Sequence, residues 1–307
     1  MKLFNIKEGS VVRVHSSPFK LEKDIQKLVE NNTGTLFNLE YVRSEFTVES
    51  FRLDTLCYDK ESNSFVIIEY KNDKKFSVID QGYTYLSLLL NNRAEFILEY
   101  NESKDGILKR DDIDWSQSRV LFISPRFTEY QKHSVNFKDV PFELWEIHKY
   151  ENDTIGLQKH EPSSSASIQM TSSGKSGSVV DSVSREVKVY NEDYHLYKNE
   201  NRPQETIDLY YKLKERILDL GDDIEIKYLA QTVQFKIDKS IVDLIIYNSG
   251  VVAVINVKKD ELEDPRKETQ DMSEKGHWGN GDYKYKVNSD SDIEYAIYLI
   301  EQAYNKA

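Results

Sequence analysis

Two carboxylates and an ammonium group lie close together in the sequence, at Asp54, Glu69 and Lys71. Hydrolysis of a phosphodiester needs a hard cation with oxygen ligands, which stabilises the developing negative charge and activates water. Carboxylates on adjacent strands supply such ligands, and a lysine beside them can orient the water or stabilise charge on the phosphate. The spacing therefore predicts a metal-dependent hydrolytic site.

The residues around these three predict two paired strands, Phe51 to Tyr58 and Phe65 to Tyr70, joined as a hairpin. Side chains two residues apart on a strand face the same side. We therefore expect Glu69 and Lys71 to project together, beside Asp54 on the neighbouring strand, while the residues that alternate with them enter the core.

Two helices should flank this hairpin. The pattern of apolar residues predicts one helix from Phe19 to Asn31 and another from Ser77 to Leu90. The second carries Gln81 and Tyr85, which lie four residues apart and therefore on one face. The first carries Glu22 near its start, where a carboxylate also suits the helix dipole.

Further elements complete a mixed α/β unit. A polar stretch without a predicted element follows the second helix. The remaining predictions are strands at 36–46, 119–124 and 142–147 and a helix at 128–136.

Four segments in this order, LEKDIQ, RLDTLCYD, IIEYK and DQGYTYLSLL, resemble the PD-(D/E)XK nuclease superfamily. The similarity is closest to the catalytic domain of NucS/EndoMS-type endonucleases, and the Gln-x-x-x-Tyr element is also similar to RecB-like nucleases. It implies a restriction-endonuclease-like mixed sheet flanked by helices. Two features depart from that family: Arg52-Leu53 replaces the usual Pro or Gly before the aspartate, and the family's N-terminal DNA-binding domain has no counterpart.

The resemblance also implies a cofactor and a set of site residues. The implied metal is Mg²⁺, for which Mn²⁺ can substitute. The resemblance implies six site residues: Asp54 and Glu69 bind the metal, Glu22 assists the metal shell, Lys71 serves catalysis, Gln81 orients the site, and Tyr85 completes the Gln-x-x-x-Tyr element.

A Ser- and Gly-rich segment divides the chain. It lacks aromatic residues and periodicity between Glu161 and Ser184, which is typical of a flexible linker. We therefore predict a nuclease-like domain at 1–158, a linker at 159–186 and a smaller α+β accessory domain at 187–307. The elements predicted for the accessory domain are a helix at 203–220, strands at 224–229, 232–237, 242–247, 251–257 and 283–287, and a closing helix capped by Ser289 and Asp292.

The accessory domain offers weaker candidates for chemistry. It resembles an uncharacterised domain found with predicted nucleases and GmrSD-like restriction proteins. Asp243 precedes Asn256 and Lys258 much as Asp54 precedes Glu69 and Lys71, but Asn is a poorer ligand than a carboxylate for a divalent cation. His277 and Trp278 lie in a Gly-rich loop, where they could contact a ligand or simply pack.

Composition limits the remaining classes. The formal net charge is −12, which argues against a protein that coats nucleic acid with a generally basic surface. No apolar run approaches the roughly 20 residues of a membrane span, and no signal peptide is evident, so we expect a cytoplasmic protein. The single cysteine, Cys57, excludes an internal disulfide and is expected in the core.

Two hypotheses remain open from the sequence. The first is a metal-dependent nuclease in repair or defence, with DNA as the favoured nucleic-acid partner and a homodimer as one assembly. The second is a catalytically inactive nuclease-like module that binds DNA or protein.

Overall fold

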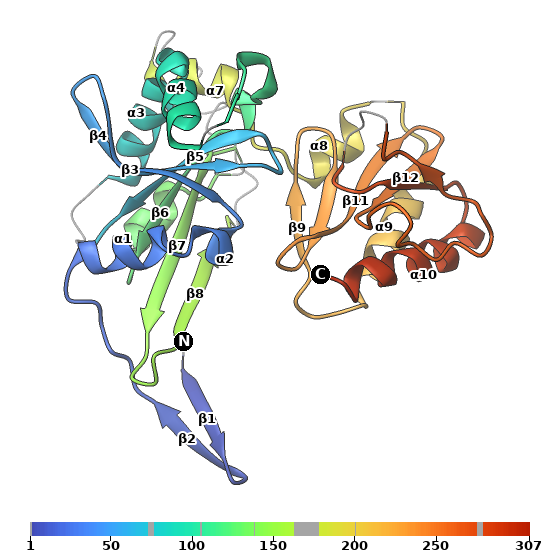
Figure 1. Cartoon of the computed structure of the whole chain (residues 1–307), viewed down its shortest axis with the longest axis horizontal. Coiled ribbons are helices and arrows are strands. Elements are labelled where there is room, and N and C mark those ends of the chain that lie inside the picture. Colours follow the sequence, from blue (N-terminus) through green and yellow to red (C-terminus); the bar gives the residue numbers. More distant parts are fainter. Residues whose placement is uncertain are drawn as a thin grey trace. The chain divides into compact units, whose positions relative to one another are not determined.

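The structure, a computed structural model, describes residues 2–72, 77–104, 106–137, 139–162, 178–199, 201–274 and 279–307. It contains two compact units, Met1–Val189 and Tyr190–Ala307, each built on its own six-stranded sheet (Figure 1). The first unit is mixed α/β and the second is a smaller α+β unit, so the predicted fold class is confirmed.

Strands β3 to β8 form the first sheet in chain order. The first three strands are antiparallel, β5, β6 and β7 are parallel, and β8 returns antiparallel to β7. Every residue of β5 is buried, as expected for a strand covered on both faces. The strand bounds are Glu40–Val48, Phe51–Asp59, Ser64–Tyr70, Arg119–Ser124, Phe142–Lys149 and Ile155–His160.

Helices cover both faces of this sheet. One face packs into the larger core cluster with α3 (Val78–Asn91), α4 (Arg93–Lys104) and α7 (Val179–Glu186), and α5 (Glu129–Ser134) follows β6 on the same side. The opposite face packs against α1 (Glu22–Glu30) and α2 (Thr33–Phe37). Glu69 therefore points to the α3 face, whereas its neighbours Ile68 and Tyr70 belong to the cluster beneath α1, as predicted.

A two-stranded hairpin, β1 (Leu3–Lys7) with β2 (Ser10–Val14), extends from the rest of the first unit (Figure 1). It exposes large apolar side chains, including those of Ile6 and Val11. No helix in the described part of the chain is both long enough and apolar enough to span a lipid bilayer.

The second sheet is antiparallel throughout, in the order β13-β14-β12-β11-β10-β9. Helices α9 and α10 pack on it and on each other. Asp292 accepts a hydrogen bond from the backbone N–H of Ser289, as predicted, although a short 3₁₀ turn (Asp290–Asp292) precedes α10. The bounds are α8 Glu192–Tyr197, α9 Gln204–Leu218, β9 Glu225–Tyr228, β10 Val233–Lys236, β11 Ser240–Tyr247, β12 Gly250–Ile255, β13 Gln270–Asp271, β14 Tyr283–Val287 and α10 Ile293–Tyr304.

The structure contains elements that were not predicted, among them β1, β2, β8, α8 and β13, and it differs from the prediction in three further places. The predicted strand 36–46 is wrong at its start, because Leu36 and Phe37 end helix α2. The polar stretch after α3 is helix α4, which buries only Phe96 and Tyr100, four residues apart, among charged neighbours. Helix α7 lies inside the predicted linker because Val183 packs into the core beside α3; residues 163–177 of that segment lie outside the described residues.

The contact between α3 and β7 can be tested at Gly82. A Cβ atom there would lie 2.5 Å from the ring of Phe142, so Gly82→Ala must displace the ring or the helix. We expect a loss of about 1–3 kcal/mol in the free energy of unfolding, measured by urea denaturation. Gly34→Ala in α2 is the matched control, because no atom lies within 4 Å of the added Cβ. Equal stability of the two variants would contradict this packing.

Candidate active site

Asp54 and Glu69 lie in the corner where β4 and β5 separate. The antiparallel pairing of these strands begins at Thr55 opposite Ile68, so the two acidic residues are the next positions on the two strands. Beyond this point the backbone N–H of Tyr70 donates to the Asp54 side chain rather than to the backbone of β4. The hydrogen bond to Asp54 Oδ2 is 3.0 Å long. The hairpin thus brings the two predicted carboxylates together.

Glu69 is almost fully buried, with 3% of its surface exposed. Its Oε1 atom accepts hydrogen bonds from Lys71 Nζ at 2.6 Å and from Gln81 Nε2 at 2.7 Å. Its Oε2 atom is buried and has no hydrogen-bond partner among the described residues. Burying a carboxylate oxygen without a partner costs free energy, so a proton donor or a cation at Glu69 Oε2 would stabilise the site.

Helix α3 supplies the side of the site opposite the sheet. Ser77 caps its start by accepting from the backbone N–H of Asp80, which fixes the helix just before Gln81. Besides Glu69, Gln81 Nε2 contacts the Tyr85 hydroxyl at 2.8 Å, one turn further along. Burial, with the nearby charge of Glu69, raises the pKa of Tyr85, so its hydroxyl remains protonated.

Glu22 reaches the site from the first turn of α1. Its Oε2 atom accepts a hydrogen bond of 2.8 Å from the backbone N–H of Asn72, the residue after Lys71. Its charge contributes to raising the pKa of Asp54. The structure therefore gathers all six residues singled out in the sequence, but Glu22 lies at the exposed edge.

The pKa of Asp54 is raised from 3.8 to about 7. Burial is the largest cause and the charge of Glu69 is the next, while the Tyr70 N–H and Lys71 act in the opposite direction. Near neutral pH the Asp54 carboxyl is therefore partly protonated unless a cation compensates the charge of both carboxylates.

The donor set fits a hard divalent cation in part. No group of three His, Cys, Asp or Glu side chains within the described ranges is close enough to hold a metal ion, so Asp54, Glu69 and Glu22 do not form a ready-made cage. Mg²⁺, however, commonly binds one or two carboxylates and keeps several waters. The unpartnered oxygen of Glu69 and the raised pKa of Asp54 are what such a two-carboxylate site would show.

Gln26 is a supporting residue that the sequence reasoning missed. It is buried on α1, and its Nε2 atom lies 3.2 Å from the backbone carbonyl of Asp54 and 3.1 Å from Glu30 Oε1. It thereby fixes the strand position that carries Asp54. The signal was present, because Gln26 follows Glu22 by four residues and shares its helix face.

Three further candidates came from the sequence: Cys57 in the first unit, Asp243 in the second, and the pair His277 and Trp278. Cys57 is fully buried and burial raises its pKa to about 12, so the expectation of a core residue is confirmed. Asp243 is also fully buried and accepts hydrogen bonds from Thr232, Ser240 and Asn280. It pairs across the strands with Val254, whereas Asn256 donates to the backbone of Ser240. His277 and Trp278 lie outside the described residues.

Substitution of Asp54 by Asn should change the pH dependence of stability. The folded-state pKa lies above the ordinary value, so the wild type is stable with the carboxyl protonated and loses stability as pH rises through about 7. Asn carries no such charge. In EDTA the variant should therefore gain about 1–4 kcal/mol over the wild type between pH 4 and pH 8, measured by urea unfolding. A difference that does not vary with pH would contradict the raised pKa.

Comparison with solved structures gives partial likenesses at low TM-scores. A complex of EndoMS with double-stranded DNA is 15% identical, with a TM-score of 0.28 over 44% of this chain and 50% of that chain. A repair endonuclease from Pyrococcus abyssi is 16% identical, with a TM-score of 0.23 over 39% of this chain and 45% of that chain. SfsA from Pyrococcus furiosus in complex with Ca²⁺ is 13% identical, with a TM-score of 0.25 over 51% of this chain and 74% of that chain. The chain thus spans about half the length of the two endonucleases it matches.

Comparison of sequences gives a full-length relative. Residues 196–307 match the family model described as a domain of unknown function (DUF5655). A protein of Haemophilus influenzae (strain ATCC 51907 / DSM 11121 / KW20 / Rd), described as an "Uncharacterized protein", is 43% identical over 304 residues, which is 99% of each chain. The chain belongs to the same family as this Haemophilus influenzae protein.

Proposed function

We propose that the first unit is a divalent-metal-dependent nuclease of the PD-(D/E)XK type that hydrolyses phosphodiester bonds, with DNA as its substrate. One observation carries the proposal: the buried Glu69 carboxylate keeps one oxygen without a partner beside a second carboxylate, Asp54. Most buried polar atoms have a hydrogen-bond partner, so a buried carboxylate oxygen without one is a candidate ligand for a cation.

Asp54 and Glu69 are the proposed ligands of Mg²⁺ or Mn²⁺. The cation would stabilise charge on the phosphate and lower the pKa of a bound water, which supplies the nucleophile. Asp54 would hold the cation as a carboxylate, so binding would lower its pKa from about 7 and release its proton. Glu22 adds negative charge at the exposed side of the site, where the described geometry leaves it bound to the backbone of Asn72.

Lys71 is the proposed catalytic cation. It holds Glu69 at 2.6 Å and its side chain is 18% exposed, so it borders both the carboxylates and the solvent through which a phosphate would arrive. An ammonium group there can stabilise the negative charge that develops on the phosphate. Gln81 holds the Glu69 carboxylate in place from α3, and the same amide contacts the Tyr85 hydroxyl.

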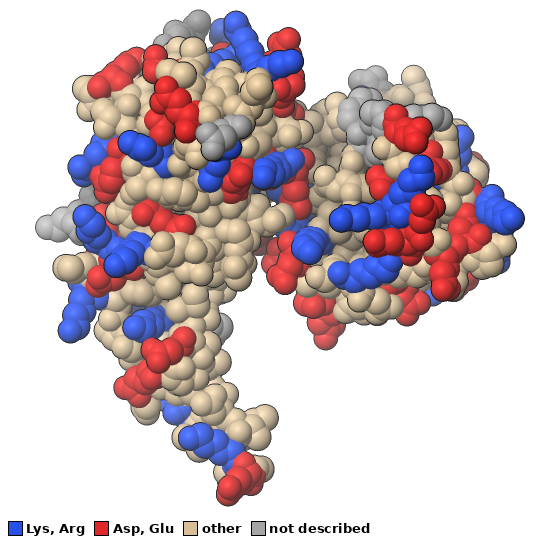
Figure 2. All heavy atoms as spheres, in the orientation of Figure 1, with Lys and Arg blue, Asp and Glu red and all other residues tan. Residues whose placement is uncertain are grey.

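The surface bears on how a nucleic acid would bind. Basic and acidic side chains are interspersed over the visible face of each unit rather than gathered into one basic area (Figure 2). The net charge of −12 also disfavours tight binding through phosphates alone. The proposal therefore expects binding that depends on the metal at the site.

A second candidate function is a nuclease-like module that binds DNA or protein without cutting. The absence of a three-ligand metal group in the described part of the chain favours it. The two functions differ in whether Asp54 and Glu69 bind a divalent cation and whether cleavage follows.

The nuclease proposal predicts metal-dependent cutting by the full chain. Single- and double-stranded DNA should be cleaved in Mg²⁺ or Mn²⁺ and remain intact in EDTA. Asp54→Asn, Glu69→Gln and Lys71→Met should each lower the rate by at least about 100-fold, because each removes charge that acts on the reacting phosphate. Rates are read from gels of end-labelled DNA.

Lys258→Met is the matched control, since Lys258 is exposed and occupies the corresponding sequence position in the second unit. It should cut at the wild-type rate. Undiminished cleavage by the three site variants would refute the assignment, and DNA binding without any cleavage would favour the second candidate.

A further inference from the structure

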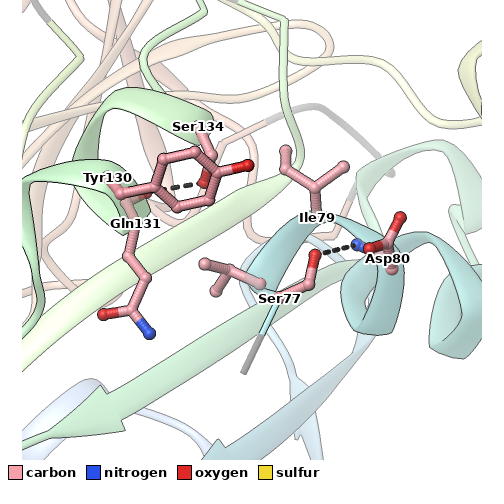
Figure 3. Close-up of a pocket in the computed structure, with 7 residues that line it drawn as sticks. Ser77, Ile79, Asp80, Tyr130, Gln131 and Ser134 are labelled. Carbon is pink, nitrogen blue, oxygen red and sulfur yellow. Dashed lines mark hydrogen bonds between the residues drawn. The ribbon is translucent and has the colours of Figure 1, made fainter. Parts of the chain in front are cut away.

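A hollow of about 210 Å³ lies between the start of α3 and α5 (Figure 3). Ser77, Ile79 and Asp80 line it from α3, and Tyr130 stands on the α5 side. Its volume is below the roughly 300–1,000 Å³ of sites that take drug-sized ligands. The hollow therefore suits one small group rather than a whole nucleotide.

Tyr130 is the unusual feature of this hollow. Its residue surface is 80% exposed, and within the described ranges its ring stacks on no other aromatic ring. Ile79 forms an apolar wall on the α3 side (Figure 3). An exposed aromatic face next to an apolar wall is a platform on which a nucleobase can stack.

The polar groups of the hollow have a definite donor and acceptor pattern. Asp80 is exposed and its carboxylate can only accept hydrogen bonds. Ser77 Oγ accepts from the backbone N–H of Asp80, so its own proton can be donated outward. An amino group beside a ring nitrogen, as in adenine, cytosine and guanine, matches this pair, whereas thymine and uracil have no amino group.

The hollow and the candidate active site both involve the start of α3. Lys71 and Ser77 are six positions apart in the chain, and Gln81, which holds Glu69, directly follows Asp80. Ser77 precedes Gln81 by four residues, which is about 6 Å along a helix axis. A base in the hollow would belong to a nucleotide close to the phosphate at Lys71.

We infer that the hollow between α3 and α5 binds one unpaired base that carries an amino group, from the strand that is cut at Asp54 and Glu69. The position of the base relative to the cut phosphate rests on the proposed function. Binding of the base in the hollow does not. A base within a duplex is stacked and paired, so it can enter only from a single strand or after leaving the helix.

The test measures binding of labelled oligo(dA), oligo(dC) and oligo(dT) to the full chain by fluorescence anisotropy, in Ca²⁺ and without cleavage. The wild type should bind oligo(dA) and oligo(dC) more tightly than oligo(dT). Tyr130→Ala should weaken binding roughly 5- to 150-fold, the range for loss of one stacked base. Tyr130→Phe should keep wild-type affinity because it keeps the ring. Asp80→Asn should remove the preference over oligo(dT).

Tyr197→Ala is the control for loss of an exposed tyrosine, since Tyr197 is 57% exposed in the second unit. Unchanged affinity and base preference in Tyr130→Ala would overturn the inference, even if Asp54→Asn abolishes cleavage and the nuclease proposal stands. Binding that depends on Tyr130 in a chain that never cuts would uphold the hollow and refute the nuclease. A duplex that binds as tightly as the single strands, with no effect of Tyr130→Ala, would also overturn it.

Discussion

Asp54 and Glu69 bring like charges into a corner of the sheet from which most water is excluded, and the rest of the unit must offset their repulsion. Lys71, the Tyr70 N–H and Gln81 each supply a proton donor to one of the two carboxylates. These donors are too few, since one Glu69 oxygen is left without a partner in the described structure. The corner is therefore a place where a cation would lower the free energy of the folded chain.

The architecture follows from the need to hold this corner. Strand β5 is buried on both faces, so Glu69 cannot turn toward water. On the α3 face, the close approach of Gly82 to Phe142 sets the height of α3 above the sheet, and Gln81 and Tyr85 reach Glu69 from that helix. On the other face Gln26 fixes the backbone of Asp54. The same position of α3 leaves the hollow in front of α5.

The sequence predicted best where one periodicity dominates. Alternation along β4 and β5 was sufficient to place Glu69 and Lys71 on one side with Ile68 and Tyr70 on the other, and spacing of four gave the Gln81 and Tyr85 pair. It failed where burial is sparse: α4 buries only Phe96 and Tyr100 among charged residues, and α7 forms on a few valines that gain stability only by packing on α3. The spacing of four places Glu22 and Gln26 on one face of α1, but it does not reveal their backbone partners, because those depend on where distant segments meet.

Calorimetric titration of the full chain with Mn²⁺, without nucleic acid and in buffers of different ionisation enthalpy, tests the central claim directly. The account predicts binding at one site with release of a proton from Asp54 at pH 6 and almost none at pH 8.5, since its pKa is about 7. Glu69→Gln should remove the binding. Equal heats for wild type and Glu69→Gln, or no binding at either pH, would show that the two carboxylates do not form a cation site.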